Sequence, residues 1–192
     1  GILAEVDKSG AAQQRFVLPK RILLIGGRTS AGTIAAGTLV RITGEGQGAL
    51  YHGAGSHLAQ MVEVARNFSP KSRRCEIWSI GVTDNGSGVA ATGTIVFTGP
   101  ATETADLILL ISGRRVTIPI ASGDASTAVA TAVAAATYTN TAVTAGASSS
   151  TVTFTAKNDG TPGNDISIVV LQAVAGVGTT ITAMASGATN PD

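Results

Sequence analysis

The sequence is poor in cysteine, in aromatic side chains and in charge. Its single cysteine, Cys75, cannot form an internal disulfide, so the fold requires no oxidising compartment. Aromatic residues make up only 4% of the 192 residues, which leaves the core to Ala, Val, Ile and Leu. Charged residues make up 13%, about half the usual share of roughly 25%. Such a weakly charged surface favours a protein that is covered by further copies of itself.

Long apolar runs and a strong net charge are also missing. No run approaches the roughly 18–20 residues of a membrane span, and the net charge is +1. We therefore predict neither a membrane nor a nucleic acid as partner. The charge is unevenly distributed: residues 1–84 hold ten Lys/Arg and six Asp/Glu, whereas residues 85–192 hold three and six. The two parts are expected to attract each other, within one chain or between chains.

Both histidines lie in the stretch YHGAGSHLAQM, beside Gly53 and Gly55. His52 and His57 are five residues apart, whereas zinc-binding helices place two histidines four apart. The glycines match the first two positions of a dinucleotide-binding fingerprint, but the third position is Leu58 and no convincing strand precedes it. We predict no metal, no cofactor and no small-molecule ligand, and interpret the histidines as polar residues near the start of a helix.

The motifs of catalysis are missing as well. The sequence contains no phosphate-binding P-loop and no G-x-S-x-G nucleophile motif, so the protein is not predicted to be an enzyme. In NDGTPGND, oxygen ligands for calcium are available at Asn158, Asp159 and Asp165, but without the spacing of an EF-hand. A Gly/Pro turn between two strands is the favoured interpretation of this segment.

Hydrophobic patterning predicts a small α/β unit in the first half of the chain. The run Ile22–Ile25 is typical of a buried strand such as parallel sheets contain. Further strands are predicted over 39–43 and 75–82. Between them, spacings of three and four predict a helix that begins at an N-cap, Ser56, and ends before Pro70. Its apolar face, expected to pack on strands 22–25 and 77–80, consists of Leu58, Met61, Val62, Ala65 and Phe68.

The Gly- and Ser-rich segment 83–93 marks a boundary, after which the chain is mostly β. Three strands are predicted over 94–99, 105–113 and 114–120, with a hairpin turn at Ser112-Gly113. An alanine-rich helix follows over 125–136, with Asp124 as its expected cap, and four further β runs follow it. The predicted fold class is therefore α+β: a strand-helix-strand unit followed by a mostly β domain with one Ala-rich helix.

The order of these segments resembles the tail sheath proteins of contractile phages, specifically the Mu-like family. The residues that carry the resemblance are RILLIGGRTSAGTIAAGTLVRIT, GAGSHLAQMV, EIWSI, ATGTIVFTGPAT, LILLISGRRVTIPI, GNDISIVV and TITAMASGATNPD. The resemblance implies an extended N-terminal arm at 1–19, part of the sheath core at 20–84 and an inserted β-rich domain at 93–187. It further implies that 188–192 begin a C-terminal core region that this chain lacks, so that the chain is an N-terminal fragment.

The same resemblance implies a structural role. Sheath subunits assemble as helical rings around a tail tube in the virion tail, made in the bacterial cytoplasm, and contract to drive the tube through the host envelope. Their partners are other sheath subunits and the tube, and extended arms add strands to neighbouring subunits. The arm residues expected to make this contact are Ile2, Leu3, Val6, Phe16, Val17 and Leu18. The alternative is a Thr-rich β adhesion or carbohydrate-binding module, although the one tryptophan, Trp78, lies outside the β-rich segment. A nucleotide-dependent enzyme is the third possibility.

Overall fold

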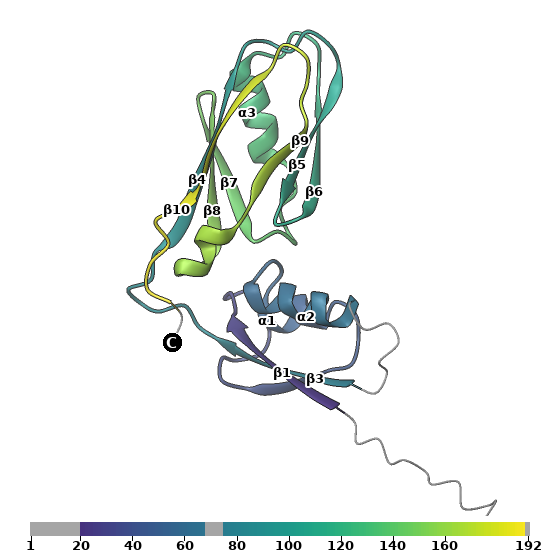
Figure 1. Ribbon diagram of the computed structural model, residues 1–192, viewed down its shortest axis with the longest axis vertical. Helices are drawn as coiled ribbons and strands as arrows, with labels where there is room; N and C mark the ends of the chain where they lie inside the picture. The colour runs from purple at the N-terminus through teal and green to yellow at the C-terminus, as the bar shows by residue number, and fades with distance from the viewer. Residues whose placement is uncertain (1–19, 68–74, 191–192) are drawn as a thin grey trace, which may run out of the picture.

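The computed structural model describes residues 20–67 and 75–190, which form two units, each with its own core. In Figure 1 the smaller unit, a sheet with helices on its upper side, lies below the larger, mostly β unit. The predicted α+β class is confirmed. In the described residues no helix combines the length and apolar character needed to cross a membrane. The Phe68 position and the arm residues of 1–19 lie outside the described ranges.

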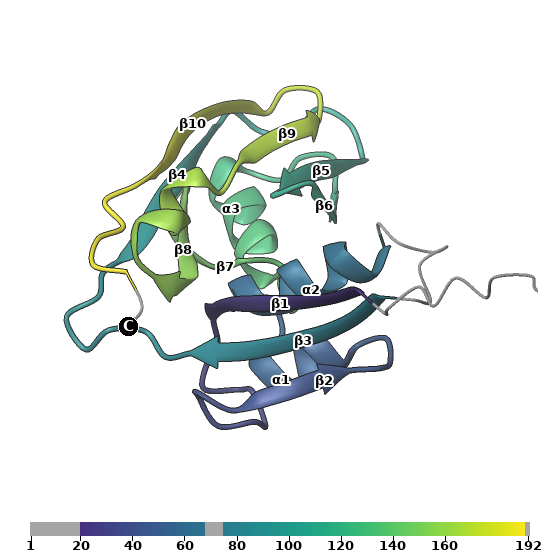
Figure 2. The same cartoon turned by 60° about the horizontal axis from the view of Figure 1, so that its bottom comes forward.

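The first unit is a sheet with strand order β1-β3-β2. Strand β1 (Lys20–Gly27) runs parallel to β3 (Cys75–Val82), as predicted, and β2 (Leu39–Ile42) pairs with β3 in the antiparallel direction. The prediction that β1 is buried is wrong, because Ile22, Leu23 and Ile25 are all exposed. Helices cover only one face of this sheet, as Figure 2 shows. By strand alternation Leu23 and Ile25 lie on the open face, and Ile22 is exposed because β1 is an edge strand.

Two helices pack on the covered face. Helix α2 (His57–Asn67) begins as predicted, since the Ser56 hydroxyl accepts a hydrogen bond of 3.2 Å from the Ala59 N–H. Its Leu58 and Val62 form a small core with Ile42 and Ile77. Met61 was expected on the same face but is largely exposed, because it lies at the margin of the sheet beside Gly26.

Helix α1 (Gln47–His52) was not predicted. It has only six residues and begins next to two glycines, Gly46 and Gly48, which are poor helix formers. Tertiary packing explains Gly48: a Cβ placed there lies 2.8 Å from a methyl carbon of Val62 in α2. The glycine allows the two helices to approach closely, and this close contact stabilises α1.

The second unit is a sandwich of two antiparallel sheets. One sheet has the order β10-β4-β8-β7 and the other β6-β5-β9. Their bounds are β4 (Ala90–Thr98), β5 (Ala105–Ile111), β6 (Arg114–Ile120), β7 (Val143–Ser148), β8 (Thr151–Asp159), β9 (Ile168–Gln172) and β10 (Gly178–Ala185). Helix α3 (Ser126–Ala135) lies between the two sheets, against β4, β7 and β8 of one and β6 of the other, and buries Val129, Ala130 and Val133 in the shared core.

Two turns of this unit test the predictions from sequence. The hairpin at Ser112-Gly113 is confirmed: Ile111 pairs with Arg114, and both turn residues have positive φ, 48° and 75°, as a two-residue hairpin turn requires. The predicted cap Asp124 is wrong. The N-cap of α3 is Ala125, and the Asp124 carboxylate instead accepts a hydrogen bond of 2.9 Å from the Ala121 N–H in the preceding turn.

Candidate functional site

The two units meet at a buried asparagine. Asn158, near the end of β8, is only 3% exposed. Its Nδ2 donates to the backbone oxygen of Arg28 and to the Asp84 carboxylate, both at 3.1 Å, and its Oδ1 accepts from the His57 N–H at 3.0 Å. These partners come from the loop after β1, the loop after β3 and the start of α2. One side chain therefore binds three separate segments of the α/β unit.

The neighbouring residue, Lys157, holds a second set of backbone groups. Its ammonium donates to the carbonyl of Ala54 at 3.3 Å, and to those of Tyr138 and Thr139 at 2.8 Å each. Burial lowers the pKa of this lysine below its ordinary value. Gly55 lies against the same group, and a Cβ placed on it falls 2.0 Å from the Thr141 oxygen. Only a glycine at this position allows the loop between α1 and α2 to approach the Thr141 backbone of the β unit so closely.

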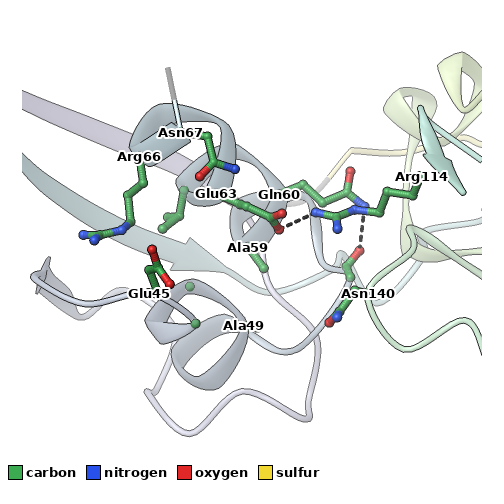
Figure 3. Close-up of a pocket in the computed structure, with 13 residues that line it drawn as sticks. Glu45, Ala49, Ala59, Gln60, Glu63, Arg66, Asn67, Arg114 and Asn140 are labelled. Carbon is green, nitrogen blue, oxygen red and sulfur yellow. Dashed lines mark hydrogen bonds and ion pairs between the residues drawn. The ribbon is translucent and has the colours of Figure 1, made fainter. Parts of the chain in front are cut away.

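A third contact crosses a cleft of about 350 Å³ between α1, α2 and the β unit. Arg114, at the start of β6, forms an ion pair with Glu63 on α2, and Figure 3 shows its side chain extending across to that helix. Glu45 and Arg66 line the cleft on the side of the α/β unit. The four charged side chains that line it sum to zero, so the cleft offers no excess charge to attract an ionic ligand.

The direction of these charge contacts is the reverse of what net charge suggests. The α/β part carries the positive excess, yet at the junction it supplies the acceptors, Glu63 and the Ala54 carbonyl. The cations, Arg114 and Lys157, come from the acidic β part. Local geometry therefore determines this contact. The opposite net charges of the two parts do not contribute to it and remain available for electrostatic attraction at other surfaces of the molecule.

The histidine interpretation needs a correction. His52 is not merely a polar residue near the start of a helix: it ends α1 and is 1% exposed beneath the sheet, where its Nε2 lies 2.8 Å from the Ser79 hydroxyl. Its pKa is lowered, chiefly by burial and further by the Arg28 guanidinium. His57 also has a lowered pKa, since burial outweighs the opposing effect of Asp84. A neutral His52 is a packed, hydrogen-bonded core residue.

The glycines of the same stretch have structural roles as well. Gly53 has a φ of 89°, and a Cβ placed on it falls 2.0 Å from the Thr29 hydroxyl. Its partner Gly55 contacts the β unit, as described above. Both glycines allow close approach of protein segments, and the half-match to a dinucleotide loop arises from that requirement.

The possible calcium ligands do not converge. The Asn158 oxygen is used at the junction, Asp159 is the last residue of β8, and Asp165 ends a short 3-10 turn, Thr161–Asp165. Within residues 20–67 and 75–190, no group of three or more His, Cys, Asp or Glu side chains is placed to hold a metal ion. The predicted Gly/Pro turn between two strands is what the structure shows there.

Sequence reasoning missed the residues that join the two units, Lys157, Asn158 and Arg114. The predicted arm residues Ile2, Leu3, Val6, Phe16, Val17 and Leu18 lie outside the described part of the chain, so the arm stays a prediction. The only local sign of the junction is Gly55, a glycine just before a helix start, which is typical of a tight turn; the structure gives it a positive φ of 81°.

Comparison with known proteins identifies the family. No protein-family model matches the sequence. Over 195 aligned residues, the chain is 30% identical to the Mu-like prophage FluMu tail sheath protein of Haemophilus influenzae. The alignment covers 98% of this chain and 39% of that protein, so the chain spans about two fifths of its relative's length. This match extends over nearly the whole chain and supports its assignment to the phage tail sheath proteins.

Proposed function

We propose that this chain is part of a structural subunit of a contractile tail sheath, which polymerises around a tail tube and contracts to drive it through the host envelope. The observation that carries this proposal is the match of nearly the entire chain to a tail sheath protein. The subunit's partners are other sheath subunits and the tube, its place is the virion tail, assembled in the bacterial cytoplasm, and its action involves no covalent chemistry.

Contraction in this proposal is a switch between two packings of the same subunits. Such a switch requires subunits that move as rigid bodies while the contacts between them are exchanged. The junction of Lys157, Asn158 and Arg114 supports this requirement, because it fixes the two units by direct hydrogen bonds and one ion pair. A small free-energy difference per subunit, summed over many subunits, then supplies the work.

Connections between subunits are proposed to come from residues 1–19. Strand β1 lies at the edge of its sheet, and no described strand pairs with its outer side. Two exposed apolar side chains, Ile22 and Met61, lie next to this edge. An extended arm from a neighbouring subunit would complete the backbone hydrogen bonds of β1 and cover both side chains. The arm residues proposed to contribute are Ile2, Leu3, Val6, Phe16, Val17 and Leu18.

Deleting residues 1–19 from the intact sheath protein is the test. Without the arm, connected sleeves should be absent in negative-stain electron microscopy. A finer variant replaces the six apolar arm residues by serine and should act like the deletion. Its control, Gln13→Ser with Gln14→Ser, keeps the apolar residues and should form normal sleeves. Sleeves of normal length after the deletion would contradict the arm assignment.

A further inference from the structure

One face of the three-stranded sheet is apolar and uncovered by any described element. Strand register and the alternation of side chains place Leu23 and Ile25 of β1, Trp78 and Ile80 of β3, and Leu39 of β2 on it. We call these five residues the outer sheet face. Leu23, Ile25 and Leu39 are 52%, 55% and 52% exposed, and Trp78 and Ile80 of the central strand β3 lie between the β1 and β2 side chains. Parallel strands are normally covered on both faces, and a contiguous apolar patch marks an interaction site.

The charges beside this face are arranged at one end. Arg21 and Arg41 both form ion pairs of 3.0 Å with the single carboxylate of Glu76. Two guanidinium groups therefore share one carboxylate, which leaves a net charge of +1 next to Leu23 and Trp78. A surface that covers the outer sheet face should be apolar with an acidic margin.

Strand β9 presents such a surface. Val169 and Leu171, 47% and 57% exposed, point away from the sandwich core. The adjoining end of β5 carries Asp106, whose backbone oxygen accepts a hydrogen bond of 3.1 Å from Gln172, and Glu103 precedes that strand. Both acidic residues are exposed. We call Val169 and Leu171 with this acidic margin the β9 face.

We propose that the outer sheet face of one copy of this chain binds the β9 face of a second copy. The contact packs apolar β surface on apolar β surface and brings the Arg21–Arg41 end against Glu103 and Asp106. It uses the opposite net charges of the two parts of the chain, which the junction within one chain leaves unused. The inference rests on the proposed role as a self-assembling subunit.

Two arguments favour this contact over a pairing of two outer sheet faces. Face-to-face pairing brings together four arginines and only two glutamates, so like charges meet. It is also isologous and closes at two copies. A contact between different faces leaves one face of each kind free at the ends, and repeated contacts of this type build rings or open helical arrays. An array is what a sheath requires.

The experiment uses two variants of the 192-residue chain, each with one face blocked. Ile25→Glu places a charge in the outer sheet face, and Leu171→Glu places one in the β9 face. In sedimentation velocity from about 10 µM to about 1 mM, the wild-type chain should associate progressively, and each variant alone should bind itself at least about tenfold more weakly. An equimolar mixture of the two variants should form heterodimers, since one intact face of each kind remains.

The matched control is Leu50→Glu, on α1, because Leu50 is also 57% exposed but belongs to neither face; this variant should associate like the wild type. A wild-type chain that stays monomeric throughout, or a mixture without heterodimers, overturns the proposal. If Leu171→Glu associates normally while Ile25→Glu does not, a pairing of two outer sheet faces replaces the proposed contact. Sleeve formation by the intact wild-type protein is scored separately. Its failure would refute the sheath role itself, whereas normal sleeves with Ile25→Glu would refute only this contact.

Discussion

At the scale of single residues, Asn158 controls how the two units are joined. Replacing it by alanine leaves the Arg28 oxygen and the His57 N–H without their partner in a buried place. An unsatisfied buried polar group costs about 1–3 kcal/mol, so Asn158→Ala should lower the free energy of unfolding by that amount. Urea denaturation followed by the fluorescence of Trp78 measures the change.

Two comparison variants make the Asn158 result specific. Thr153→Ala, an exposed position on the same strand, should change the free energy of unfolding by less than about 0.5 kcal/mol. Asn158→Asp keeps the acceptor for His57 but faces the Asp84 carboxylate, and combining it with Asp84→Asn should restore part of the lost stability. An Asn158→Ala protein as stable as the wild type would show that the hydrogen bonds of Asn158 contribute no net free energy.

His52 predicts how stability depends on pH. Its folded-state pKa lies below the unfolded value of about 6.5, so the unfolded chain binds more protons between the two values. Stability should therefore fall as the pH drops below about 6.5, and this contribution should level off below the folded pKa. His57 acts in the same direction.

The measurement for His52 is the free energy of unfolding between pH 7.5 and 5.5. His52→Gln keeps a polar group near Ser79 but cannot titrate, so its curve should be flatter than that of the wild type. Each proton taken up on unfolding contributes a slope of at most about 1.4 kcal/mol per pH unit. Parallel curves for the two proteins would mean that His52 is readily protonated in the folded state.

At the scale of secondary structure, most strands could be predicted because their signals are local. The run CEIWSIGV coincides with β3, and the hairpin at Ser112-Gly113 follows from its two turn residues. Helix α1 and the cap of α3 could not be predicted, because each depends on a tertiary or loop contact. The burial of β1 was misjudged for a related reason. An apolar run shows that a strand carries surface that is favourable to bury, but not which element covers that surface.

The junction lay beyond local reasoning altogether. Asn158 binds a carbonyl that is 130 residues away in the sequence, and its own neighbourhood, KNDG, resembles an ordinary turn. An asparagine in such a segment suggests a turn or a calcium ligand when only adjacent residues are considered. Gly55 showed the same limitation, since a glycine before a helix indicates a tight turn but not the β unit that the structure places against it. Long-range polar contacts of this kind leave no periodic pattern in the sequence.

At the scale of the whole molecule, the two units have unequal cores. Among the described residues, the core cluster of the β unit contains 23 buried apolar residues, whereas that of the α/β unit contains four. Since stability comes mainly from apolar area removed from water, the α/β unit should depend on its contacts with the β unit, and should unfold first on heating. Trp78 is the only tryptophan and lies in β3, so its fluorescence reports on the α/β unit alone. We expect its thermal transition to precede the loss of β circular dichroism.

Separating the units tests the same asymmetry directly. A fragment of residues 86–190 should fold on its own and unfold within a few degrees of the second transition of the whole chain. A fragment of residues 20–84 should show no cooperative transition, because its four-residue core and open sheet face bury too little apolar area. Asn158→Ala in the whole chain should move the Trp78 transition to lower temperature and leave the β transition nearly unchanged. Coincident transitions that shift together in this variant would instead show that the two units unfold as one cooperative body, with the junction as strong as either core.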